Sequence, residues 1–252
     1  MVEQEKKATI QSVDRAVHIL RLFEDVEELG VTEISRRLGL HKSTTFGIVN
    51  TLTMNRFLER NQNSGKYKLG LDLFRISSGA QMGIRKIGAV HVARLVEDTG
   101  ETVNLAVKDD IYVVYVEKKE SHHSMRICTT IGQRLPMYCT AMGKAILAHL
   151  EQSEVERIFA KSEVTPYTNR TICTKEELLF HLDQIRARGY SLDDEEFEYG
   201  LVCVAVPVMN IMNEPIAALS VSGPKQRMSA ENIERIYPLL RSHAQTLSRE
   251  LF

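Results

Sequence analysis

Two pairs of residues are of types that enzymes use in active sites, but their spacing in the sequence argues against a catalytic site at either pair. Gly143-Lys144 could end a phosphate-binding loop only if a glycine stood five residues before Gly143, and position 138 is Tyr. Cys139 and His149 could act as nucleophile and base, yet a predicted helix start separates them and gives them no reason to meet. The motifs G-x-S-x-G and H-E-x-x-H do not occur. We therefore expect no catalytic residues and no enzyme activity.

The spacing of histidine and cysteine does not support a metal site. His122 and His123 lie near Cys128, but a fourth ligand is missing, and surface histidines explain the group more simply. The chain has no C-x-x-C pair, and free thiols in a reducing compartment are expected for Cys128, Cys139, Cys173 and Cys203. The polar first residues do not resemble a secretory signal, and the longest uncharged apolar stretch, 201–209, is too short to span a bilayer. We expect a cytoplasmic protein without metal, cofactor or membrane contact.

Small-molecule binding is better supported. The first indication is a predicted helix start in the second half of the chain. Pro136 precedes a helix expected to begin near Ala141. The backbone N–H groups of Thr140, Ala141 and Met142 would then be free to bind an anion above the helix start.

Two predicted strands place further polar groups in register. Leu201 and Cys203 share one face of the first strand, and Ser220 and Ser222 share one face of a later strand. Apolar walls with a few convergent polar groups are typical of sites for small metabolites. We expect a small organic acid as the ligand.

A positively charged segment lies in the first half of a chain whose overall net charge is only −1. Residues 31–68 carry two acidic residues, Glu33 and Glu59, and these basic ones: Arg36, Arg37, Lys42, Arg56, Arg60, Lys66 and Lys68. All six prolines of the chain stand at position 136 or later, where the charge balance is negative. This asymmetry indicates an amino-terminal domain that contacts a polyanion, followed by a different second domain.

The periodicity of the first 70 residues predicts three helices and a hairpin. Ser12 is expected to cap the first helix and Thr32 the second, which Gly39 would end. After a tight turn, the third helix covers about 42–55, and short strands are expected at 57–60 and 66–69. Together these elements predict a winged helix-turn-helix.

The third helix would place its free face in the major groove of DNA. Phe46 on that face could contact a thymine methyl group or pack against the wing, and both possibilities stay open. The cations of the hairpin would follow the phosphate backbone. The expected DNA-binding residues are Arg36, Lys42, Ser43, Thr44, Phe46, Gly47, Asn50, Arg60, Lys66 and Lys68.

The chain beyond the wing predicts a two-domain protein with an α+β second domain. We expect a DNA-binding domain at 1–70, a helical linker at 71–84 and an effector-binding domain at 85–252. Runs rich in Val, Ile and Tyr predict strands at 102–107, 111–116, 125–131, 201–208 and 216–222. Helices are predicted at 86–98, 141–150 and 153–161, from a capping box at Thr174 and Glu177, and at 229–251.

This order of motifs resembles the isocitrate lyase regulator (IclR) family of bacterial transcription factors over about residues 10–250. The matching segments are QSVDRA at 11–16, TEIS at 32–35, GLHKST at 39–44, GKYKLG at 65–70, LPM at 135–137 and GKA at 143–145. The resemblance implies a DNA-binding head and a GAF-like effector domain. Family members often carry a basic residue where this chain has Gly47, so one side-chain contact to DNA is missing here.

The resemblance also implies an effector pocket, position by position. Asp193 begins the acidic run 193–196, which on its own is most simply a solvated loop, and only the resemblance singles Asp193 out. The implied pocket residues are Ser124, Ile127, Ala141, Met142, Asp193, Leu201, Cys203, Ser220 and Ser222.

The sequence therefore predicts a dimeric or dimer-of-dimers regulator that binds a near-palindromic double-stranded operator under the control of a small organic acid. Repression is the commoner mode in the family it resembles. The alternative is a metabolite-sensing or catalytic α+β domain with an appended protein-interaction module.

Overall fold

The computed structural model describes residues 10–24, 26–77 and 82–252, except for the side chain of Met82. The chain forms two compact units, Met1–Met82 and Gly83–Phe252. The first part of the predicted linker is helix α4 (Leu71–Ser77), and residues 78–81 lie outside the described residues.

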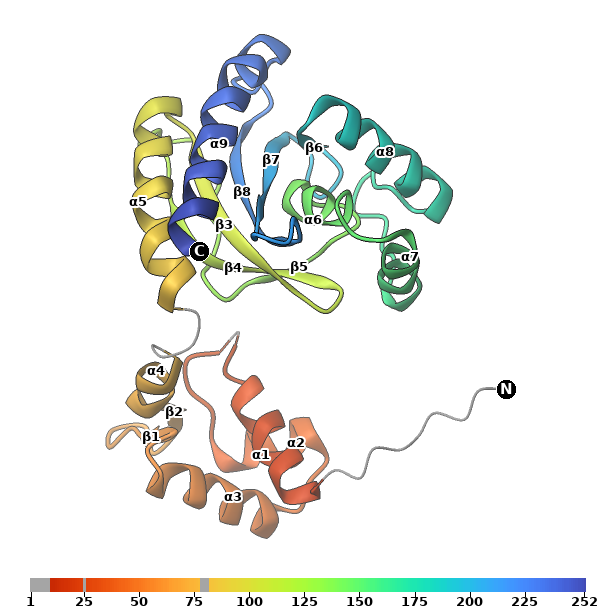
Figure 1. Cartoon of the computed structure of the whole chain (residues 1–252). Coiled ribbons are helices and arrows are strands. Elements are labelled where there is room, and N and C mark those ends of the chain that lie inside the picture. The colour runs from red at the N-terminus through yellow and green to blue at the C-terminus, as the bar shows by residue number, and fades with distance from the viewer. Residues whose placement is uncertain (1–9, 25, 78–81) are drawn as a thin grey trace. The chain divides into compact units, whose positions relative to one another are not determined.

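The amino-terminal unit is a winged helix-turn-helix (Figure 1). It consists of α1 (Gln11–Arg21), α2 (Val31–Leu38), α3 (Lys42–Met54), β1 (Leu58–Arg60), β2 (Tyr67–Leu69) and α4. The wing is an antiparallel hairpin in which Leu58 pairs with Leu69 and Arg60 pairs with Tyr67. Ile19, Ile34, Val49 and Leu58 are almost completely buried and join the helices to the hairpin in one small core.

Two predicted helix caps are wrong, and one predicted helix end is confirmed. α1 begins one residue before Ser12, with Ile10 at the N-cap position. Gly30, not Thr32, caps α2, and its backbone N–H donates to the Glu33 carboxylate at 2.8 Å. Gly39 ends α2 with a φ of 62°, in the left-handed region that glycine adopts at low cost.

The second unit is built on a six-stranded antiparallel sheet with the order β5-β4-β3-β8-β7-β6. The strands are β3 (Thr102–Asp109), β4 (Tyr112–Lys119), β5 (Arg134–Pro136), β6 (Ser191–Asp194), β7 (Leu201–Met209) and β8 (Pro215–Pro224). The helices are α5 (Met82–Thr99), α6 (Ala141–Leu147), α7 (Gln152–Lys161), α8 (Lys175–Arg188) and α9 (Ala230–Leu251). The predicted fold class, a winged helix-turn-helix followed by an α+β domain, is confirmed.

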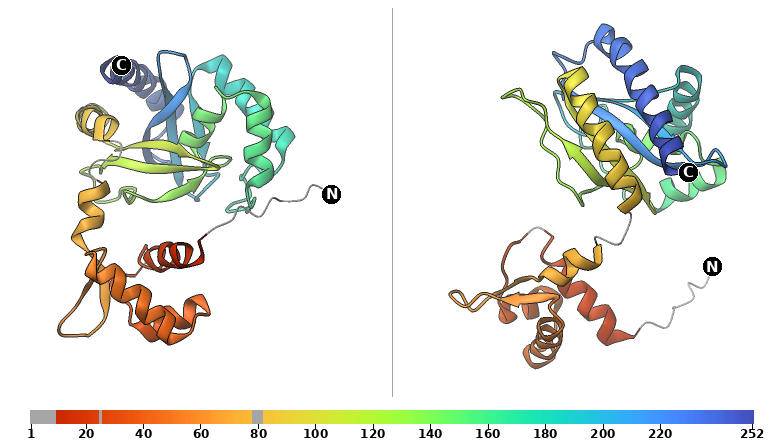
Figure 2. Two further views of the ribbon diagram at one scale, coloured as in Figure 1. Left: turned by 60° about the horizontal axis from the view of Figure 1, so that its bottom comes forward. Right: turned by 60° about the vertical axis from the view of Figure 1, so that its left-hand side comes forward.

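Helices cover both faces of this sheet, so the unit has two cores (Figure 2). α5 and α9 pack on one face over the alternate residues Val204, Val206 and Leu219. α6, α7 and α8 lie on the opposite face, where Ala106, Ala205 and Ala218 are in contact with the core. Small residues on this second face allow α6 to lie close to the strands, and Gly143 is in contact with the backbone of Met137.

Two predictions about strands are wrong. Residues 125–131 form no strand, and the edge of the sheet is instead completed by β5, three residues further on. The acidic run after Leu192 is not wholly a solvated loop, because its first two residues belong to β6 and pair with β7. Pairing with another strand decided both cases, and neither segment shows that pairing by itself.

Candidate DNA-binding and effector sites

The free face of α3 is open to solvent, as expected of a helix that reads DNA. Lys42, Ser43, Gly47 and Asn50 are exposed, whereas Thr45 and Val49 on the opposite face are buried. Phe46 is 55% exposed, so its ring lies largely open on this face. A side chain at Gly47 would meet no atom within 4 Å, so the missing contact reflects residue choice and not lack of space.

The cations of this unit differ in how far they are already neutralised. Lys66 Nζ lies 3.5 Å from Glu33 Oε2, and Lys68 Nζ lies 3.8 Å from Glu59 Oε2. Arg60 donates from Nε to the Gly65 carbonyl at 3.3 Å, which orders the guanidinium along the wing. Arg36 and Lys42 are exposed and have no ion pair within the described residues. Such unpaired cations are available for phosphate oxygens.

A small cavity lies between the sheet and the start of α6. Its volume is about 30 Å³, the space of roughly one water molecule. Of the nine predicted effector residues, the following seven line it: Ala141, Met142, Asp193, Leu201, Cys203, Ser220 and Ser222. It is also lined by Thr140, whose backbone N–H was predicted to bind an anion, and by Tyr115, Leu135 and Phe197, which were not predicted for this site.

Strand register places the polar floor of this cavity on one face of the sheet. Ser222 pairs with Cys203, which pairs in turn with Asp193, so three neighbouring strands each contribute one polar side chain. Burial raises the pKa of the Cys203 thiol, which is therefore neutral. The Ser220 hydroxyl is completely buried and has no hydrogen-bond partner within the described residues. A buried hydroxyl without a protein partner is unusual, and a water molecule or a ligand would satisfy it.

Asn104 extends this polar floor by one strand. It pairs with Ser220 across β3 and β8, and its Nδ2 is also buried without a partner within the described residues. Its Oδ1 accepts a hydrogen bond from the Thr129 hydroxyl at 2.6 Å. Its partner on β4 is Lys118, whereas its partner on β8, Ser220, lines the cavity. The sequence analysis missed Asn104 because an asparagine within a predicted strand carries no local signal of function.

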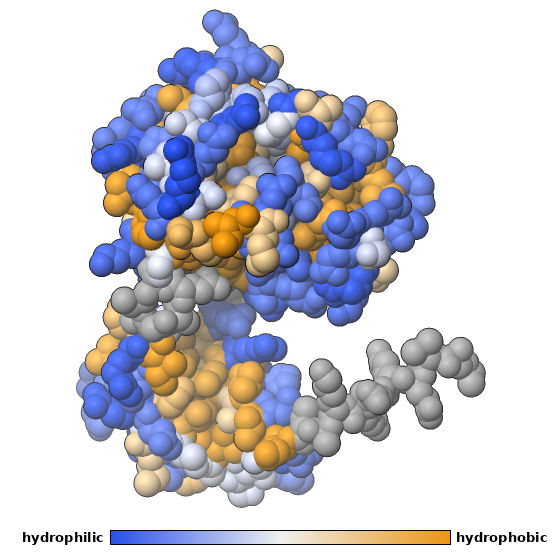
Figure 3. Space-filling view, viewed as in Figure 1, coloured by the Kyte–Doolittle hydropathy of each residue, from blue (hydrophilic) through white to orange (hydrophobic). Residues whose placement is uncertain are grey.

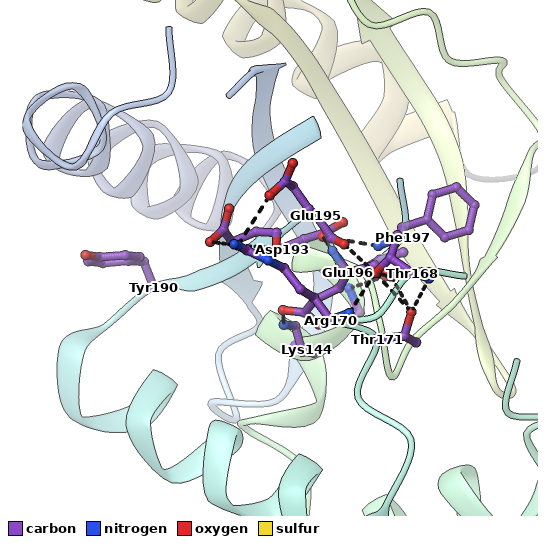
Figure 4. Close-up of polar contacts among 12 residues, drawn as sticks. Lys144, Thr168, Arg170, Thr171, Tyr190, Asp193, Glu195, Glu196 and Phe197 are labelled. Atoms are coloured by element: carbon purple, nitrogen blue, oxygen red, sulfur yellow. Dashed lines mark hydrogen bonds and ion pairs between the residues drawn. The ribbon is translucent and has the colours of Figure 1, made fainter. Parts of the chain in front are cut away.

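Asp193 is 2% exposed and holds the loop that follows β6 (Figure 4). Its Oδ1 accepts the backbone N–H of Glu196 at 2.7 Å and that of Phe197 at 3.4 Å. Burial, reinforced by the nearby Glu196 carboxylate, raises the pKa of Asp193 from 3.8 to about 7. The side chain therefore titrates near neutral pH while it lines the cavity.

A buried ion pair connects the same loop to α6. Lys144 Nζ contacts Glu196 Oε1, and the two side chains are 1% and 8% exposed. The Thr171 hydroxyl donates to the Glu196 carbonyl at 2.7 Å, and the Thr168 hydroxyl donates to the Glu195 carbonyl at 2.6 Å (Figure 4). Residues from α6, from the segment before α8 and from β6 thus hold one wall of the cavity.

Ser124 and Ile127 do not line the cavity. Both lie in the irregular segment between β4 and β5, where Ser124 is exposed and Ile127 is half-buried. The Ile127 carbonyl accepts a hydrogen bond from Thr102 Oγ1 at 3.0 Å, which ties the segment to β3. Their role as effector residues stays a prediction.

The described residues hold neither a membrane-spanning helix nor a cluster of metal ligands. No helix among them is long and apolar enough to cross a membrane. They contain no group of three or more His, Cys, Asp or Glu side chains that could hold a metal ion.

Comparison with known proteins covers both units. Residues 12–62 match the model of the IclR helix-turn-helix domain, and residues 77–249 match that of the bacterial transcriptional regulator IclR C-terminal domain. The chain is 37% identical to the HTH-type transcriptional regulator XynR of Escherichia coli over 96% of its own length and 97% of that protein. It is 35% identical to the regulator KdgR of the same organism, over 96% and 93%.

Solved structures agree with these matches. The IclR protein of Thermotoga maritima is 30% identical, with a TM-score of 0.78 over 96% of this chain and 99% of that one. An IclR homologue from Microbacterium hydrocarbonoxydans, described as complexed with 4-hydroxybenzoate, is 26% identical, with a TM-score of 0.86 over 95% and 98%. The predicted family and the prediction that the protein is not an enzyme are both confirmed. The chain belongs to the IclR family of bacterial transcriptional regulators.

Proposed function

We propose that this regulator binds a near-palindromic operator as a homodimer or dimer of dimers and that a small organic acid, held in the cavity below α6, controls this binding. Several related regulators are named repressors, including the transcriptional repressor IclR of Escherichia coli at 32% identity, and repression is the proposed mode. A protein that binds operator DNA acts where that DNA is, so the proposed location is the cytoplasm.

The open face of α3 carries the DNA-binding part of the proposal. Its exposed small and polar residues suit base edges, and unpaired Arg36 and Lys42 suit phosphates. Changing both Lys42 and Arg60 to Ala should weaken binding to every sequence and flatten the salt dependence by roughly one unit of slope per lost contact. Gel shifts on the DNA upstream of its own gene, at several salt concentrations, measure both. An unchanged slope would contradict the backbone role.

The unpartnered hydroxyl of Ser220 supports the effector part of the proposal. A bound acid would supply the missing hydrogen-bond partners of Ser220 and Asn104. Because the cavity holds only about 30 Å³, binding requires the side chains around it, such as Phe197 and Met142, to move apart. The related protein in complex with 4-hydroxybenzoate is consistent with a carboxylic acid as the ligand class.

Thermal-shift measurements test this part, with 4-hydroxybenzoate, pyruvate and other small carboxylic acids as probes. An acid that stabilises the protein should also change operator binding. Changing Ser220 and Ser222 to Val should abolish that response and leave operator affinity intact. Retention of the full response would refute the assigned cavity.

An exposed apolar stripe on α1 supports the dimer. Ile10, Val13 and Val17 recur on one helix face and are 71%, 58% and 42% exposed. Apolar side chains gather over α1 on the face seen in Figure 3, and Leu71 of α4 in the same unit is 70% exposed. A second copy of this unit would cover the stripe, since two-fold pairing also matches paired half-sites in the operator.

A further inference from the structure

A hollow of about 470 Å³ opens on the surface of the second unit, away from the effector cavity. Its walls come from the end of α8 (186–189), from the last part of β7 (206–209) and from α9 (237–245). It shares no lining residue with the effector cavity. Its volume is within the range that holds metabolite-sized ligands.

The charge of this hollow is one-sided. Arg186, Arg188, Arg241 and His149 line it, and no Asp or Glu does so. The neighbouring hollow beside α7 differs, because Glu151 and Asp183 are among its lining residues. Arg186 already pairs with Asp183, which lies outside the lining, so Arg188 and Arg241 are the guanidinium groups that make this concave surface attractive to anions.

Two of these guanidinium groups are not neutralised. Arg188 donates from Nε to the Tyr190 carbonyl at 2.7 Å, and its guanidinium carbon lies 4.9 Å from the centre of the Tyr190 ring. Burial lowers the pKa of Arg188, and the described residues give it no ion pair. Arg241 has neither a hydrogen bond nor an ion pair in the described part of the chain. Leaving the half-buried Arg188 cation unpaired is costly, and an oxyanion held between it and the exposed Arg241 would offset that cost.

The walls are held in place before any ligand arrives. Arg186 donates from Nη1 to the Ala148 carbonyl at 2.9 Å, which fixes its direction. Gly189 ends α8 with a φ of 88°, and a Cβ there would lie 2.3 Å from the Tyr237 hydroxyl of α9. The rings of Tyr190 and Tyr237 lie 4.9 Å apart. Close packing thus sets the separation of α8 from α9.

We infer that this hollow is a second ligand site, which binds a small multiply charged oxyanion bearing phosphate or several carboxylates. The guanidinium groups would bind the charged oxygens by paired hydrogen bonds. Val206, Pro207 and Ala244 provide an apolar floor for the carbon skeleton. Such a ligand would differ in charge from the acid proposed for the inner cavity, which no unpaired cation lines.

Calorimetric titration of the full-length protein with pyrophosphate and with citrate, at low ionic strength, tests the inference. At least one of the two should bind, and which one binds distinguishes a phosphate ligand from a carboxylate ligand. The changes Arg188→Gln and Arg241→Gln should each weaken binding about tenfold or more, as expected for the loss of a charge-assisted hydrogen bond. Arg241→Gln removes no side-chain hydrogen bond or ion pair within the described structure, so it remains informative if Arg188→Gln unfolds.

Two controls separate this site from the rest of the molecule. Arg235→Gln removes an exposed charge of α9 outside the hollow and should leave anion binding unchanged. Ser220→Val alters the inner cavity and should also leave it unchanged, so failure here and failure of the proposed effector site are distinguishable. Failure of both anions to bind, or binding unaffected by both arginine changes, would overturn the inference. It would also be overturned if the arginine changes weakened binding to a non-operator DNA duplex, because the hollow would then be a DNA-contact surface.

Discussion

Replacing Asp193 with Asn should change how the stability of the protein depends on pH. Asn keeps the Oδ1 that accepts the N–H groups of Glu196 and Phe197 but cannot ionise. Because folding raises the pKa of Asp193 from 3.8 to about 7, the folded state holds this proton more tightly than the unfolded chain does. The contribution of Asp193 to stability is therefore most favourable below pH 4, and it is lost progressively as pH rises towards 7.

The size of this effect follows from the two pKa values. The full difference corresponds to about 4 kcal/mol, and about 3 kcal/mol of it falls between pH 5 and pH 8. As pH rises from 5 to 8, the unfolding free energy of Asp193→Asn should therefore rise by about 3 kcal/mol relative to that of the unchanged protein. Urea unfolding followed by circular dichroism at pH 5, 6, 7 and 8 measures the unfolding free energy of both proteins. Titratable groups that both proteins contain cancel when one free energy is subtracted from the other.

Glu198 provides a matched control in the same loop. Its side chain is exposed, so Glu198→Gln removes one carboxylate of this loop without changing a buried group. A difference for Asp193→Asn that stays constant with pH would refute the assignment of a near-neutral titration to Asp193. The same titration has a functional corollary: an anionic effector beside Asp193 should bind more weakly above pH 7, where the aspartate is charged.

Three further changes test other parts of the structure. Lys144→Met should lower the unfolding free energy by about 3–5 kcal/mol because it leaves the Glu196 charge buried and unpaired. Adding Glu196→Leu should restore most of this loss in the same urea assay, and a double variant as unstable as the single one would contradict this. Gly189→Ala should cost about 2 kcal/mol or more, since it forces a φ of 88° on alanine and brings its Cβ to 2.3 Å from the Tyr237 hydroxyl, while Gly47→Ala in the open face of α3 should cost nothing. Val13→Asp with Val17→Asp should shift the protein towards monomers in sedimentation velocity and reduce operator affinity, and an unchanged oligomer would exclude α1 as the contact.

Local patterns were sufficient wherever the structure depends on nearby residues. Apolar residues three or four positions apart indicated helices, such as Ile34 and Leu38 in α2 and Ile48 and Leu52 in α3, because a helix places every third or fourth residue on one face. Gly39 marked the end of α2, and Thr174 marked the start of α8, where its hydroxyl accepts the Glu177 N–H. The alternation along β7 correctly placed Cys203 on the cavity face.

The interior of the effector cavity depended on contacts between residues that are distant in the chain. Neither the place of Asp193 in an edge strand nor the pairing of Asn104 with Ser220 leaves a local trace, because register is set by which strands become neighbours. The Lys144–Glu196 pair joins two positions that look like ordinary surface charges in the sequence. The sequence by itself determined the family, the helices, most of the strands and most of the residues around the cavity. Only the tertiary structure decided which of their polar groups are buried and which lack a partner, because burial depends on the whole chain that packs around them.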